Sequence, residues 1–201
     1  MSTILKFAAL VITALGMNIS LLSAAIDAEI AQNFVENIGY EILTMINDDE
    51  MIKGSTELEK ILRKYVAFDA VSRFTMGRYW KSMSEDQKKD FSEIFIHRIA
   101  VGYLRQIASF RGKSFEVTGA VDAGSRGIVV KMDVSPPKNS DNFHAKPITL
   151  EWLVNGNNKN PIIVDLLIEG ISMAIMQRTE FSFLLEESDG DINKFMERIV
   201  K

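Results

Sequence analysis

The side chains that could do chemistry in this sequence are few. It contains two histidines, His97 and His144, and no cysteine. A metal site usually needs three or four clustered His, Cys or carboxylate ligands, and neither histidine has such a partner at ligand spacing. Nucleophilic catalysis needs a thiol or an activated serine, and the sequence has no cysteine and no Gly-x-Ser-x-Gly elbow. We therefore expect no metal, no cofactor and no catalytic residue.

One pair of carboxylates could still act as acid or base. Asp165 and Glu169 lie four residues apart, so a strand would place both on one face, about 13 Å from each other. That distance is too long for a paired acid and base. Either one could act alone as a general base inside an apolar pocket, because desolvation raises the pKa of a carboxyl group. A small pocket enzyme therefore remains an alternative. Otherwise the two carboxylates face solvent or pair with Arg78 or Arg178.

These carboxylates belong to the last of four predicted strands. In each strand apolar residues alternate with others, and turn residues separate the strands. In the last strand, Ile162, Val164, Leu166 and Ile168 are expected to share one face. The four strands are predicted at residues 113–119, 128–134, 148–154 and 162–169.

Amphipathic helices are predicted on both sides of the strands. A first helix is expected over 26–46, and two further helices over 172–186 and after Gly190. Because the strands are consecutive and joined by short turns, the order predicts an α+β domain with an antiparallel sheet of about four strands, wrapped by N- and C-terminal helices.

Two capping boxes mark helix starts in the N-terminal half. A Ser or Thr followed three residues later by Glu or Gln can satisfy two backbone N–H groups at a helix start. Thr56 with Glu59 predicts one such start, and Ser84 with Gln87 predicts another. After Ser84, bulky residues recur every four positions, which is typical of a long helix with one apolar face. These residues are Phe91, Phe95, Ile99, Tyr103 and Ile107.

Residues 1–25 have the pattern of a secretory signal peptide. Lys6 precedes an apolar run from Phe7 to Leu22 that ends in the small residues Ser23-Ala24-Ala25. We expect cleavage after Ala25 and a single domain over 26–201, free in an exported compartment. Without Lys6, the 23 cations of the chain become 22 against 27 anions, a formal charge of −5. This charge argues against nucleic acid as a partner.

Several segments resemble the toluene-tolerance family of periplasmic phospholipid carriers. The most specific of them surrounds Gly170. The segments that carry the resemblance are Phe68-Asp69, Arg73 to Trp80, Ser84 to Lys88, Tyr103, Phe110-Arg111-Gly112, Asp165, Glu169-Gly170-Ile171-Ser172, Gln177-Arg178 and Phe181.

The resemblance implies a lipid-transport function in the Mla pathway of Gram-negative bacteria. Such a carrier moves phospholipid between an outer-membrane lipoprotein–porin complex and an inner-membrane ABC transporter with an MCE subunit, and so maintains outer-membrane lipid asymmetry. The implied fold is a twisted antiparallel sheet wrapped by helices, similar to cystatin-like and NTF2-like folds, with the acyl chains of the cargo phospholipid inside. We expect a monomer.

A lipid pocket is predicted from the inward apolar stripes, and the resemblance adds Ile171. Two other readings stay open. The chain could carry a different apolar ligand, such as a hopanoid or a quinone, or it could be an interaction module with a filled core. The predicted lipid-binding residues are Phe95, Ile99, Tyr103, Val130, Met132, Leu150, Trp152, Val164, Leu166, Ile168 and Ile171.

Overall fold

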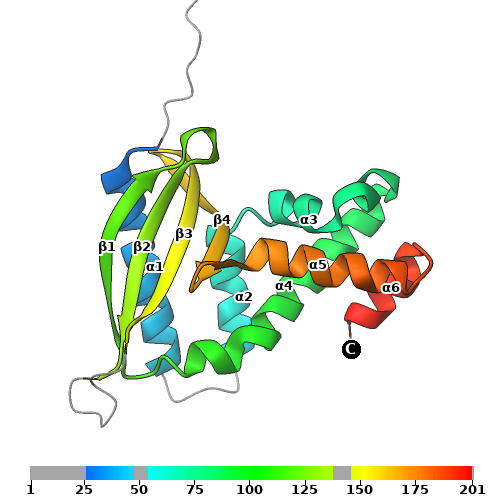
Figure 1. Cartoon of the computed structure of the whole chain (residues 1–201). Coiled ribbons are helices and arrows are strands. Elements are labelled where there is room, and N and C mark those ends of the chain that lie inside the picture. The colour runs from blue at the N-terminus through cyan, green and yellow to red at the C-terminus, as the bar shows by residue number, and fades with distance from the viewer. Residues whose placement is uncertain (1–25, 48–53, 138–145, 201) are drawn as a thin grey trace, which may run out of the picture.

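An antiparallel sheet with the sequential strand order β1-β2-β3-β4-β5 forms one side of the protein (Figure 1). The computed structural model describes residues 26–47, 54–137 and 146–200. The predicted signal peptide and His144 lie outside these residues. Four long strands and one two-residue strand confirm the predicted α+β class. The strands are Ser114–Asp122 (β1), Ile128–Ser135 (β2), Ile148–Asn157 (β3), Asn160–Ile168 (β4) and Ile171–Ser172 (β5).

The helices lie on the inner side of the sheet and beyond its β4–β5 edge. In Figure 1, α1 lies behind the sheet, while α3, α5 and α6 gather at the opposite end of the molecule. The α-helices are Ala28–Asn47 (α1), Gly54–Tyr65 (α2), Phe68–Met76 (α3), Glu85–Ala108 (α4), Met173–Glu186 (α5) and Ile192–Ile199 (α6). Short 3₁₀ helices span Gly77–Ser82 (η2) and Gly124–Arg126 (η3).

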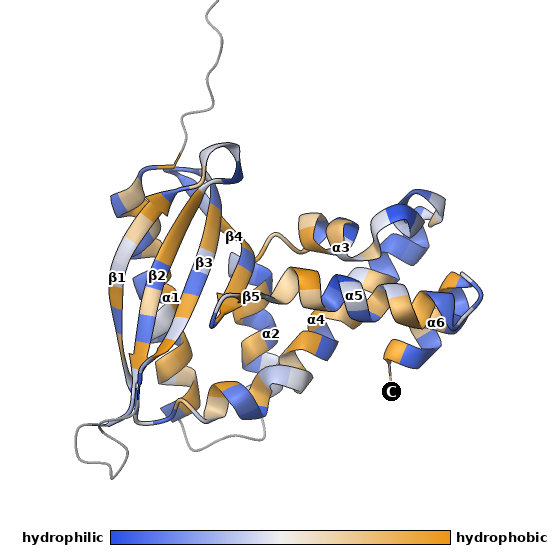
Figure 2. Cartoon of the chain, in the orientation of Figure 1, coloured by the Kyte–Doolittle hydropathy of each residue, from blue (hydrophilic) through white to orange (hydrophobic). Residues whose placement is uncertain are grey.

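The alternation of residue types explains which face of the sheet is buried. In β2, Val130 and Met132 are buried while Lys131 between them is exposed, as a period of two requires. Figure 2 shows the same succession of hydrophobic and hydrophilic segments along β3. The buried face packs against α1, whose Ala31 and Val35 belong to the same apolar cluster. This cluster is the first of two cores.

A β-bulge in β4 changes the predicted side-chain pattern. Ile163 pairs with Val154 and Asp165 pairs with Leu153, so Val164 is an extra residue without a partner in the β3–β4 register. The prediction that Ile162, Val164, Leu166 and Ile168 share one face is therefore wrong. Ile163 takes the inward position beside Leu166 and Ile168, because a single extra residue exchanges the two faces of a strand.

The second core is an aromatic cluster between α3, α4, α5 and α6. Phe91 and Phe95 of α4 meet Phe181 of α5 and Phe195 of α6, with ring centroids 5.1 to 6.1 Å apart. All four side chains are buried. Most of these ring pairs are edge-to-face or tilted, as the charge distribution of aromatic rings favours.

The start of α4 confirms the second predicted capping box. Ser84 Oγ accepts a hydrogen bond from the backbone N–H of Gln87, and Gln87 Oε1 accepts one from the backbone N–H of Ser84. The first predicted box is wrong, because α2 begins at Gly54 and so contains both Thr56 and Glu59. Glu59 instead faces α4, where His97 Nδ1 lies 2.6 Å from its carboxylate.

Candidate ligand cavity

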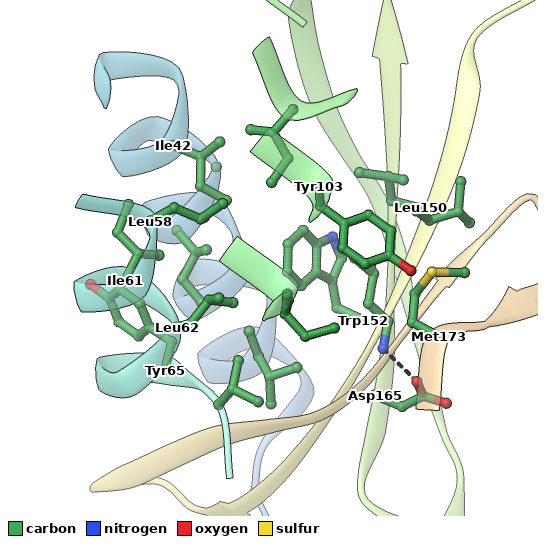
Figure 3. Close-up of a pocket in the computed structure, with 18 of the residues that line it drawn as sticks. Ile42, Leu58, Ile61, Leu62, Tyr65, Tyr103, Leu150, Trp152, Asp165 and Met173 are labelled. Atoms are coloured by element: carbon green, nitrogen blue, oxygen red, sulfur yellow. Dashed lines mark hydrogen bonds between the residues drawn. The ribbon is translucent and has the colours of Figure 1, made fainter. Parts of the chain in front are cut away.

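A cavity of about 220 Å³ lies between the sheet, α1, α2, α4 and the first turn of α5. An engineered cavity of roughly 150 Å³ in another protein stays dry and binds benzene, so this space is large enough for an apolar ligand. Its lining is almost wholly apolar. Figure 3 shows Leu58, Ile61 and Leu62 of α2 on one side and Leu150 and Trp152 of β3 on the other.

Helix α4 connects the aromatic cluster to the cavity. Its first half carries Phe91 in the filled core, whereas Ile99, Tyr103 and Ile107 in its second half line the cavity. Phe95 contributes to both. The predicted four-residue stripe is thus correct as a helix face, but its two ends have different neighbours.

The close approach of α1 to β1 shapes one wall of the cavity. A Cβ atom on Gly39 of α1 would lie 2.6 Å from Cζ of Phe115, a distance that van der Waals repulsion forbids. Glycine at this position therefore lets the Phe115 ring lie against the helix backbone. Both residues line the cavity.

Nine of the eleven predicted lipid-binding residues line this cavity. Val130 does not, because it is fully buried in the first core beside α1. Ile171 does not either, since its side chain on β5 is 60% exposed and lines a separate shallow hollow. The expected placement of Ile171 in the pocket is therefore wrong. The nine residues are Phe95, Ile99, Tyr103, Met132, Leu150, Trp152, Val164, Leu166 and Ile168.

One group that the prediction missed belongs to α2. This helix covers the cavity with one apolar face, and the sequence does show the spacing of such a face. Nothing in the spacing indicates that the face meets a cavity instead of a filled core. The residues of α2 that line the cavity are Leu58, Ile61, Leu62 and Tyr65.

Asp165 lies at the edge of the cavity beside Met173 (Figure 3), where it holds the start of α5. One carboxylate oxygen accepts the N–H groups of Leu166, at 2.8 Å, and Ala174, at 3.1 Å. The other oxygen accepts the hydroxyl of Ser172 at 2.5 Å. Because a helix N-terminus has unpaired N–H groups and a partial positive charge, a carboxylate is stabilising there. Asp165 therefore joins β4, β5 and α5.

Glu169 occupies a tight turn outside the cavity. Ile168 pairs with Ile171, so Glu169 and Gly170 form a two-residue loop, with φ values of 49° and 80°. Positive φ at both positions is the type I′ geometry, which glycine adopts easily and glutamate does not. Two hydrogen bonds to Thr149 hold Glu169 there: its N–H donates to Thr149 O at 3.0 Å, and its carboxylate accepts Thr149 N–H at 2.6 Å.

The hydrogen bond from Thr149 N–H lowers the pKa of the Glu169 carboxyl, with Lys146 adding to the effect. A general base in an apolar pocket would need the opposite shift. Glu169 is also exposed to solvent. Glu169 therefore lacks the environment that the pocket-enzyme alternative requires.

The Glu169 turn gives a pH-dependent contribution to stability. A carboxyl whose folded-state pKa is lowered stabilises the fold above its unfolded pKa, and this contribution is lost as the pH falls through the folded pKa. We expect the wild type to lose stability relative to Glu169→Gln between about pH 5 and pH 3. Urea unfolding across this range measures the difference. Glu116→Gln, at an exposed position of β1, is the control. The prediction is contradicted if the difference in free energy of unfolding between the wild type and Glu169→Gln stays the same across this pH range.

No described group of three or more His, Cys, Asp or Glu side chains could hold a metal ion. His97 contacts Glu59 on the surface, and its side chain is 65% exposed. Within the same residues, no helix combines the length and the hydrophobicity needed to span a bilayer.

The fold and the cavity define a class of protein: an α+β domain with a mostly apolar, ligand-sized cavity between its sheet and its helices. The chain belongs to the MlaC protein family. The sequence pattern of this family matches residues 14–201. This match confirms the family resemblance found in the sequence.

A solved structure shares the fold. It is a phospholipid-binding protein from Ralstonia solanacearum, determined in complex with a phospholipid. The two proteins are 17% identical, with a TM-score of 0.69, and the match covers 84% of this chain and 94% of the other.

Proposed function

We propose that this protein is a carrier of phospholipid that holds acyl chains in the cavity between the sheet and α2. The apolar cavity carries this proposal. Each methylene removed from water contributes about 0.8 kcal/mol, so an enclosed apolar space favours a long hydrocarbon chain. The phospholipid in the related Ralstonia solanacearum structure supports the same cargo.

Membership of the MlaC family supports a finer proposal about transport. The carrier acts in the periplasm, after removal of residues 1–25, as a monomer without a cofactor. It receives and delivers phospholipid between an outer-membrane lipoprotein–porin complex and an inner-membrane ABC transporter with an MCE subunit. This transfer maintains the lipid asymmetry of the outer membrane. No catalytic step is needed, because the cargo leaves chemically unchanged.

The proposal is tested by native mass spectrometry of residues 26–201, purified from a Gram-negative host without detergent. We expect a mass increment of phospholipid size that disappears after organic extraction. Analysis of the extract then distinguishes phospholipid from a hopanoid or a quinone. A protein that stays at its bare mass, even after incubation with phospholipid vesicles, would overturn the proposal.

A further inference from the structure

Two polar atoms at the cavity have no hydrogen-bond partner within the described part of the chain. One is the indole N–H of Trp152 on β3, and the other is the side-chain oxygen of Gln177 on α5. Trp152 is 7% exposed and Gln177 is 6% exposed, and both residues line the cavity. Buried polar groups are nearly always paired, since leaving one unpaired costs free energy.

A third polar group, the hydroxyl of Tyr103 on α4, lies beside Gln177. Gln177 Nε2 donates a hydrogen bond to this oxygen at 3.4 Å, a long distance for such a bond. Partial burial raises the pKa of the Tyr103 phenol, so it remains a donor at neutral pH. Tyr103 is itself one of the residues that line the cavity.

The amide of Gln177 can reverse this arrangement. A half-turn about its terminal bond would let the side-chain oxygen accept the Tyr103 O–H, and would free the NH₂ group as a donor. Two cavity-lining residues would then carry buried unpaired donors, the Trp152 indole N–H and the Gln177 amide. Hydrocarbon chains offer no acceptor for either of them, and a core filled only by side chains would be better served by Phe and Leu at these positions.

We propose that Trp152 and Gln177 bind the ester linkages of the cargo, each donating a hydrogen bond to one ester carbonyl oxygen. This inference rests on the proposed function and specifies which chemical part of the lipid is recognised. A diacyl phospholipid has two ester carbonyls between its headgroup and its chains, which matches the two donors in number. Tyr103 is a positioning residue, because its O–H holds the Gln177 amide in the donating orientation.

The test offers the protein two lipids that differ only in these carbonyls. Dioleoyl phosphatidylglycerol and its dioleyl diether analogue are mixed in equal amounts in vesicles, and native mass spectrometry measures which one the protein carries. Because an uncharged hydrogen bond is modest in strength, we expect the wild type to favour the diester about tenfold. Trp152→Phe and Gln177→Leu should each reduce this preference to about threefold, because each removes one of the two hydrogen-bond donors.

Trp80→Phe is the matched control, because Trp80 is the other tryptophan of the chain and lies on η2 beside the aromatic cluster. It should keep the tenfold preference. Equal uptake of the two lipids by the wild type, or an unchanged preference in Trp152→Phe, would overturn this inference and leave the proposed function standing. Uptake of neither lipid would overturn the proposed function itself. Circular dichroism verifies that each variant is folded.

Discussion

Ile99→Glu is expected to abolish lipid retention while the protein stays folded. Ile99 lies on α4 where the helix passes from the aromatic cluster to the cavity. A carboxylate there would face the acyl chains, and moving a charged group out of water costs several kcal/mol when nothing pairs with it. Bound phospholipid should fall by about 100-fold or more. Native mass spectrometry of the purified variant measures the loss, and circular dichroism verifies the fold.

The control for this change lies two residues further along the same helix. Val101 is 51% exposed, so Val101→Glu adds the same charge to α4 on its solvent side and should leave the lipid content unchanged. Lipid retained by Ile99→Glu at the wild-type level would contradict the assignment of the cavity as the acyl-chain site. Equal loss in both variants would indicate an effect of charge on α4 as a whole.

Phe181→Ala is expected to have the largest effect on stability. The ring is 0% exposed and contacts Phe91, Phe95 and Phe195. Removing a buried phenyl ring leaves a hole that its neighbours fill only in part, and such changes cost about 3–5 kcal/mol. The midpoint of thermal unfolding should fall by about 10 °C. Urea unfolding of the lipid-free protein measures the change without a contribution from the ligand.

Phe183 on the same helix provides the comparison. Its side chain is 59% exposed, and Phe183→Ala should change the free energy of unfolding by no more than about 0.5 kcal/mol. If the two variants lose the same stability, the aromatic cluster is not the main source of stability at this end of the molecule.

The sequence contained enough local information for most of the fold. The Ser84 and Gln87 side chains interact with backbone groups only three residues away, so the start of α4 could be predicted without knowing the rest of the structure. The alternation in β2 likewise reflects one buried and one exposed face. Both features depend on neighbours in the chain, and both are found as predicted.

The errors at the cavity and in β4 concern features set by distant parts of the chain. The bulge at Val164 depends on how β4 pairs with β3. The residue type at position 164 does not indicate a bulge. The family resemblance implies a place in the pocket for Ile171. The type I′ turn at Glu169 and Gly170 instead reverses the chain and turns Ile171 to solvent. The spacing of apolar residues predicts which face of a helix or strand is buried. It does not predict whether side chains fill the space beside that face or leave a cavity.

The first half of α4 packs in the aromatic cluster and its second half lines the cavity. This difference has a consequence for evolution. Substitutions at widely separated sites usually act independently. The cavity-lining positions near Tyr103 and Ile107 can therefore change in size without weakening the contacts around Phe91. Under the proposed function, the preference for longer or shorter hydrocarbon chains can then change while selection on folding acts at the other end of the same helix.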